Sequence, residues 1–122
     1  MDSRTMTKTI HNIIAAVLLI GASHGAMAKD YYQNGNKLLA SCEGENIFNQ
    51  DVCVGYLQAV EDTYNSAAEW KGFETGICAP ISVTGGQLVK VWVKYANEHP
   101  EKLHLSAASL VLLAYRDAFP CD

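Results

Sequence analysis

The sequence lacks the features that mark several functional classes. Its one marked apolar run, residues 13–20, is far shorter than the roughly 20 residues that a membrane span needs. It has no block of like charge, and 13 Asp and Glu against 9 Lys and Arg leave the chain mildly acidic. Nucleic acid and anionic membrane surfaces are therefore poor candidate partners, whereas a basic protein would suit better.

Motifs for metal, redox and acid–base chemistry are also missing. The four cysteines form no C-x-x-C pair, so neither a zinc knuckle nor a dithiol redox site has its usual spacing. His99 and His104 flank a proline, but two ligands without a third nearby make a poor metal site. Glu61 and Asp62 are adjacent, so on a helix they point about 100° apart and form no acid and base couple. We expect no metal, no cofactor and no enzymatic activity.

The first 28 residues have the pattern of a secretory signal peptide. Arg4 and Lys8 give a basic start, the short apolar run follows, and residues 26–28 read A-M-A, a cleavage pattern. We expect cleavage after Ala28 and export to the periplasm without a membrane anchor. The mature chain, 29–122, then has 94 residues and a net charge of −5, from 7 basic and 12 acidic side chains. A chain of this size forms one domain with a marginal core.

The first half of the mature chain predicts two helices. A turn at 34–36 precedes a short helix at 37–42. The second helix follows a cap at Asn49 or Asp51, and its apolar residues recur at helical spacing and are expected to face the core. Residues 70–82 contain two glycines and a proline and are predicted to be a loop. The apolar residues of the second helix are Cys53, Tyr56, Leu57, Val60, Tyr64 and Ala67.

The second half predicts two more helices. Thr84 and Gln87 form a capping box for the third, which we expect to end near Glu98 because Pro100 follows. A cap at Ser106 begins the fourth. No alternating strand pattern competes in the mature chain. The sequence therefore predicts an all-α fold, a small disulfide-stapled bundle of about four helices.

Leftover apolar surface on the last two helices predicts a homodimer. The fourth helix is apolar nearly all round until Arg116, which is typical of a central helix or of one buried against a second subunit. Val89 and Val93 lie off the main apolar face of the third helix. Since a small chain has little core to cover these residues, we expect a second copy to cover them.

Four cysteines in an exported chain of this size predict two disulfides. Cys42 ends the first predicted helix and Cys53 opens the second, so an antiparallel hairpin brings them to the same end of the bundle. The same reasoning brings together Cys78, before the third helix, and Cys121, after the fourth. We predict these two pairs. The crossed pairing, Cys42 with Cys121 and Cys53 with Cys78, is the alternative, and peptide mapping would distinguish the two.

The order of several short motifs resembles the Rap1a/Tai family of immunity proteins. The motifs are G-N-K-L-L-A-S-C, C-V-G-Y-L-Q, I-C-A-P-I, V-K-Y-A-N-E-H-P-E and A-F-P-C, and they span Gly35 to Cys121. Ala59 departs from the pattern, because the resemblance implies glycine there. The residues that match are Cys42, Cys53, Gly55, Tyr56, Cys78, Pro80, Pro100, Ala107, Pro120 and Cys121.

This resemblance implies a function as well as a fold. It implies a periplasmic, non-enzymatic helical protein, often a homodimer, that binds a peptidoglycan amidase effector delivered by type VI secretion. Binding would occlude the active-site cleft of the amidase and protect the cell from its own or a sibling's toxin. A rigid, disulfide-stapled body suits an inhibitor, because rigidity lowers the ordering cost of association.

Two segments are the predicted contacts with this partner. The first is the aromatic, glycine-containing segment after the second helix, since exposed aromatic residues make efficient binding anchors. The second is the proline turn after the third helix. Ordinary packing on the bundle is the alternative for the first segment, and a solvated loop for the second. The residues are Trp70, Lys71, Phe73 and Glu74 in the first segment, and His99, Pro100, Glu101, Lys102 and His104 in the second.

Two other functions would fit a small helical binding module. An acid-stress chaperone needs groups that titrate at low pH in a dimer interface, and the mature chain has many acids but only two histidines. Acid-induced dissociation with protection of client proteins would support this function. A saposin-like lipid binder expects more disulfides and a large apolar cavity, and vesicle binding would test it.

Overall fold

The computed structural model describes residues 31–122, so the predicted signal peptide and its cleavage site lie outside the described residues. The described chain folds into four α-helices and one 3-10 turn, without a strand. This confirms the predicted all-α bundle. None of the described helices is both long enough and apolar enough to cross a bilayer. The helices are α2 (Gly35–Cys42), α3 (Ile47–Lys71), α4 (Gly85–Glu98) and α5 (Ala107–Ala118), and the turn is η1 (Pro100–Lys102).

Helix α3 begins earlier than the sequence pattern predicts. Its cap is Asn46, whose side-chain oxygen accepts a hydrogen bond of 2.8 Å from the backbone N–H of Asn49. The predicted caps Asn49 and Asp51 were therefore wrong, and both residues lie inside the helix. Compared with a cap at Asn49, the helix gains Ile47, Phe48 and Asn49.

Helix α3 also ends later than predicted. Trp70 and Lys71 form its last turn, so the prediction of a loop from residue 70 was wrong by two residues. The helix stops at Gly72, which has φ of 69°, in the left-handed region that glycine adopts readily. No helix breaker stands between Ala67 and Gly72, which is why the helix runs on to the glycine.

The starts of α4 and α5 are held in different ways. At α4 the predicted capping box is confirmed: Thr84 Oγ1 accepts from the N–H of Gln87, and Gln87 Oε1 accepts from the N–H of Thr84. At α5 the side chain of Ser106 makes no capping hydrogen bond, although the residue stands at the predicted position. The N–H of Ala107 donates instead to the carbonyl of Gln33, at 3.1 Å.

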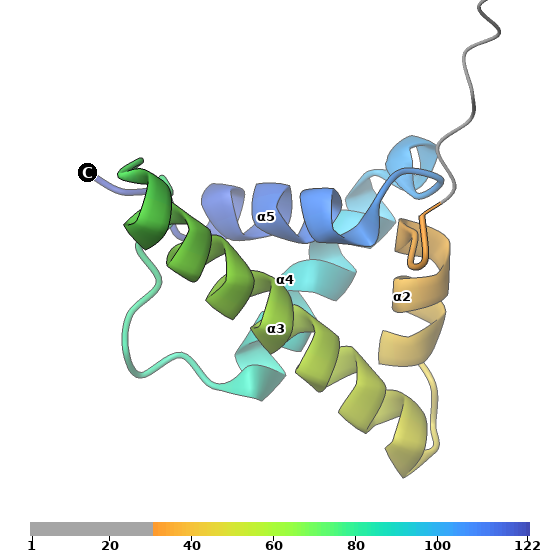
Figure 1. Cartoon of the computed structure of the whole chain (residues 1–122). Coiled ribbons are helices and arrows are strands. Elements are labelled where there is room, and N and C mark those ends of the chain that lie inside the picture. Colours follow the sequence, from red (N-terminus) through yellow and green to blue (C-terminus); the bar gives the residue numbers. More distant parts are fainter. Residues whose placement is uncertain (1–30) are drawn as a thin grey trace, which may run out of the picture. The chain divides into compact units, whose positions relative to one another are not determined.

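The core contains residues from all four helices. Trp92 of α4 is fully buried beside Leu57 of α3 and Leu110 and Tyr115 of α5. Figure 1 shows α3 lying across α4 and α5, with α2 at its N-terminal half. Only three residues of the 25 in α3 are buried, so most of this long helix lies at the surface of the bundle.

Both disulfides have the predicted pairing. Cys42 is bonded to Cys53, which joins the end of α2 to the first half of α3, with a Cα–Cα distance of 4.9 Å. Cys78 is bonded to Cys121, with a Cα–Cα distance of 5.0 Å, and the N–H of Cys78 also donates to the carbonyl of Phe119. The loop between α3 and α4 is thereby attached to the segment that follows α5.

Candidate functional site

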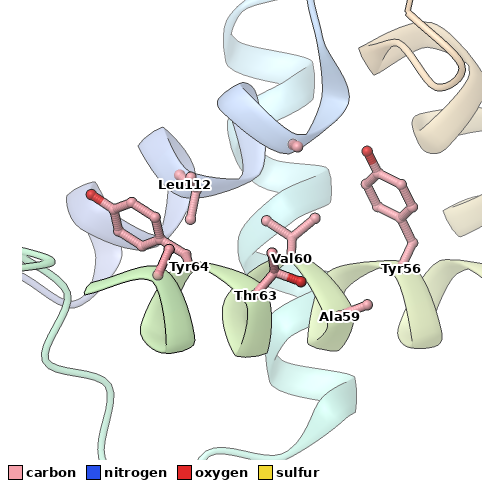
Figure 2. Close-up of a pocket in the computed structure, with 8 residues that line it drawn as sticks. Tyr56, Ala59, Val60, Thr63, Tyr64 and Leu112 are labelled. Atoms are coloured by element: carbon pink, nitrogen blue, oxygen red, sulfur yellow. The ribbon is translucent and has the colours of Figure 1, made fainter. Parts of the chain in front are cut away.

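Helices α3 and α5 form an apolar groove at the surface, with a volume of about 410 Å³. The α3 side contributes Tyr56, Val60 and Tyr64, and the α5 side contributes Ala108 and Leu112 (Figure 2). The sequence pattern placed the α3 residues in the core stripe with Cys53 and Leu57. Cys53 and Leu57 are buried as predicted, whereas these three side chains are only partly buried and line the groove.

The two tyrosines of the groove have their hydroxyls engaged by α5. Figure 2 shows both rings extending from α3 toward α5. Burial raises the pKa of Tyr56, and a hydrogen bond with the backbone of Ala108 lowers it in part. The Tyr64 hydroxyl accepts from Nη2 of Arg116 at 3.4 Å. Since neither hydroxyl is free and the other lining residues carry no acid, base or thiol, the groove is suited to binding apolar groups.

A second feature of α3 is a row of solvent-exposed apolar and small residues on its outer face, which we call the outer stripe. Its members are separated by 4, 7, 4 and 7 residues, so successive members return to the same face of the helix. Three of them have large apolar side chains with exposed fractions of 72%, 38% and 81%, in chain order. The outer stripe consists of Phe48, Val52, Ala59, Thr63 and Trp70.

The outer stripe adjoins the groove. Ala59 and Thr63 line the groove, and Thr63 also lines a neighbouring hollow that reaches Trp70. Exposed apolar side chains that gather on one face, rather than standing singly, are a feature of interaction surfaces. The groove and the outer stripe together therefore form the candidate binding surface.

The first predicted contact segment lies at one end of this surface. Trp70 belongs to the outer stripe, and the ring of Phe73 packs against that of Tyr64, with centroids 5.5 Å apart. Lys71 and Glu74 are exposed. The structure thus brings this segment next to the groove.

The second predicted contact segment is a turn held together by its own side chains. The ring of His99 lies 4.4 Å from that of Tyr95, and its Nδ1 lies 3.4 Å from Lys102 Nζ and 3.5 Å from a carboxylate oxygen of Glu101. Pro100 begins η1, and His104 is exposed. The carbonyl of Leu103, which lies between η1 and His104, accepts a hydrogen bond of 2.9 Å from the N–H of Asn36 in the first turn of α2. Figure 1 shows this turn near α2, away from the last turn of α3, so the structure does not bring the two predicted segments together.

Outside the groove, a carboxylate of α3 and a buried phenol of α5 lie close enough for the charge of Glu61 to act on Tyr115. The Tyr115 hydroxyl is buried and has no hydrogen-bond partner within residues 31–122. Burial, and secondly the charge of Glu61, raise its pKa. Glu61 is partly buried, and burial, and secondly the charge of Asp62, raise the pKa of its carboxyl above the ordinary 4.5.

Glu61→Gln is expected to raise the melting temperature at pH 7 by a few degrees and to leave it unchanged at pH 4. With its pKa raised in the folded protein, Glu61 binds its proton more tightly there than in the unfolded chain. The folded state therefore loses stability as the pH rises from about 4.5 through the folded-state pKa, and glutamine removes this loss. Melting followed by circular dichroism at both pH values measures it, with the exposed Glu45→Gln as control. A variant less stable than the wild type at pH 7 would contradict the interpretation.

The outer stripe was not identified from the sequence. The signal was present, because Phe48, Val52 and Trp70 have the same helical spacing as the core residues. The predicted start at Asn49 or Asp51 removed Phe48 from the helix, and the predicted loop removed Trp70.

Among the described residues, no group of three or more His, Cys, Asp or Glu side chains is placed to hold a metal ion.

Comparisons with known proteins identify the scaffold. Searches against curated proteins and against solved structures found no match. A family model described as Rap1a immunity proteins matches residues 34–121, a segment that includes α2 to α5 and all four cysteines. Because the match covers most of the sequence and the whole helical bundle, the chain belongs to the Rap1a immunity protein family.

Proposed function

We propose that this protein is a periplasmic immunity protein that binds a peptidoglycan amidase delivered by type VI secretion and blocks its active site. The match to Rap1a immunity proteins carries the proposal, since an immunity protein acts by binding a cognate secreted effector. The groove fits this role, because its lining offers apolar contact and no catalytic group.

Two features support the periplasmic location. Residues 1–28 have the pattern of a signal peptide, and the four cysteines form two disulfides, which persist in oxidising compartments such as the periplasm. Peptidoglycan lies in the same compartment, so an inhibitor placed there meets an incoming amidase at its substrate.

The homodimer stays a prediction, and we propose that a second copy covers exposed apolar side chains such as Leu113 of α5, which is 40% exposed. Val89 and Val93 support it less than the sequence pattern suggests, because both are partly buried against the core and Val89 lines a hollow beside Cys53 and Val54 of α3. Sedimentation of the mature chain at micromolar concentration tests it, and a monomer would contradict it.

Deletion of the gene is expected to make cells sensitive to siblings with an active type VI apparatus. We expect a loss of viability of at least about tenfold in mixed culture, restored by the full chain but not by a chain without residues 1–28. The effector is then the secreted protein whose removal from the attacker ends the killing. The purified effector should cleave peptidoglycan amide bonds, and an equimolar amount of the mature chain should stop the cleavage.

Matched controls separate the parts of this proposal. Attackers with an inactive apparatus should not kill the deletion strain. Full survival of the deletion strain beside active attackers would reject the immunity role, and an effector that cleaves glycosidic bonds would reject only the amidase assignment. Protection by the chain without residues 1–28 would contradict the periplasmic location.

A further inference from the structure

Beside the outer stripe runs a row of three carboxylates on α3, which we call the acidic row: Asp51, Asp62 and Glu69. Their separations, 11 and 7 residues, return to nearly the same direction around an α-helix, and the row extends about 27 Å. All three side chains are exposed. None forms an ion pair with another residue of the described segment, where the two ion pairs are Lys94 with Glu98 and His99 with Glu101.

The acidic row and the outer stripe lie next to each other on the helix. With 100° per residue, the three carboxylates point about 40° to 120° away from the stripe residues, all on the same side of them. The groove lies on the opposite side of the stripe, toward α5. One face of α3 therefore presents three parallel bands: a groove, an exposed apolar band and an unpaired acidic band.

The charge pattern of this face favours a basic partner protein over a second copy of the chain. If a second copy packed its α3 antiparallel across a two-fold axis, equivalent edges would meet, and the two acidic rows would face each other. A partner with basic side chains along one edge would pair with the acidic row instead.

We propose that this face of α3 is the surface that binds the secreted effector, and that the effector presents to it an elongated apolar ridge bordered by lysine or arginine side chains. The inference rests on the proposed immunity function. The apolar ridge covers the outer stripe and inserts a side chain into the groove between Tyr56 and Tyr64, and the basic side chains pair with the acidic row. The apolar contacts set the lifetime of the complex, and the charges speed its formation.

The acidic row is tested with the effector that the sibling competition identifies. Asp51→Asn with Asp62→Asn and Glu69→Gln should lower the association rate constant about tenfold at low salt, and the difference should vanish near 0.5 M NaCl. The control, Glu45→Gln with Glu98→Gln and Asp117→Asn, removes the same charge from exposed positions outside α3. It should change the rate by less than about twofold. Equal rates for the two triple variants would overturn the role of the acidic row.

The outer stripe is tested by introducing arginine, a bulky and positively charged side chain. Ala59 is exposed at the middle of the stripe, so Ala59→Arg should fold normally and raise the effector Kd by about 100-fold or more. Gln50→Arg adds the same side chain to the same helix at an exposed position that points away from both the stripe and the acidic row, and should change the Kd by less than about twofold. Thr63→Arg is a second variant at the stripe, and circular dichroism checks that each protein is folded.

The outcomes distinguish this inference from the proposed function. If deletion of the gene gives no sensitivity, the immunity role fails and the inference fails with it. If an effector is found but Ala59→Arg and Thr63→Arg still bind it with wild-type Kd, only the inference fails. If these variants dissociate a homodimer while effector binding is unchanged, the face belongs to a second copy, and the inference is likewise overturned.

Discussion

Replacing Cys78 and Cys121 with alanine is expected to lower the free energy of unfolding by about 4 kcal/mol, in the chain-entropy treatment of crosslinks. The two cysteines are 43 residues apart, so this disulfide restricts a long loop of the unfolded chain. A loss of this size is comparable with the whole net stability of a small domain. Urea unfolding under non-reducing conditions measures the loss.

The Cys42–Cys53 disulfide provides the matched comparison. Its cysteines are 11 residues apart, and the same treatment gives about 3 kcal/mol for a loop of that length. Cys42→Ala with Cys53→Ala should therefore destabilise less than the other pair through loop entropy, although Cys53 is also a buried core residue. A loss below about 1 kcal/mol for the Cys78–Cys121 pair would show that the unfolded chain is already restricted without it.

Trp92→Ala is expected to lower the free energy of unfolding by about 3 to 5 kcal/mol. The side chain is fully buried among residues of the core, so its removal loses apolar contacts and leaves a cavity. The midpoint of urea unfolding should fall accordingly, without a change in the unfolding slope.

The other tryptophan is the control for this measurement. Trp70 is 81% exposed, so Trp70→Ala should change the stability by less than about 0.5 kcal/mol. We expect the same Trp70 variant to weaken effector binding, because this residue belongs to the outer stripe. Comparable destabilisation by both substitutions would contradict the burial that separates them.

Features determined by local chemistry could be predicted from the sequence. The capping box of Thr84 and Gln87 needs only two side chains three residues apart. The pairing of Cys42 with Cys53 and of Cys78 with Cys121 followed from helix order, since antiparallel neighbours bring their connected ends together. The fold class was predictable without knowledge of the contacts, because helical spacing recurs along the mature chain and no alternating strand pattern competes with it.

Features determined by tertiary packing could not be predicted in the same way. Helical spacing places Cys53, Leu57 and Tyr64 in one stripe, but it does not reveal which part of the stripe α5 covers. Leu57 is buried, whereas Tyr64 is only partly buried and lines the groove together with Leu112 of α5. Most residues that match the family pattern, such as the four cysteines, are of structural type, so they identify the scaffold and leave the proposed contact surface largely to residues outside the pattern, such as Phe48 and Trp70.

The opposite exposures of the two tryptophans make the protein its own fluorescent reporter. Trp92 is shielded from water, so its emission should lie at shorter wavelength and shift to the red only when the core opens. Trp70 stands in solvent on the proposed contact face, so a quencher such as iodide should reach it freely until a partner covers it. Quenching of the Trp92→Phe variant would then follow complex formation, and emission of the Trp70→Phe variant would follow unfolding, without any attached dye.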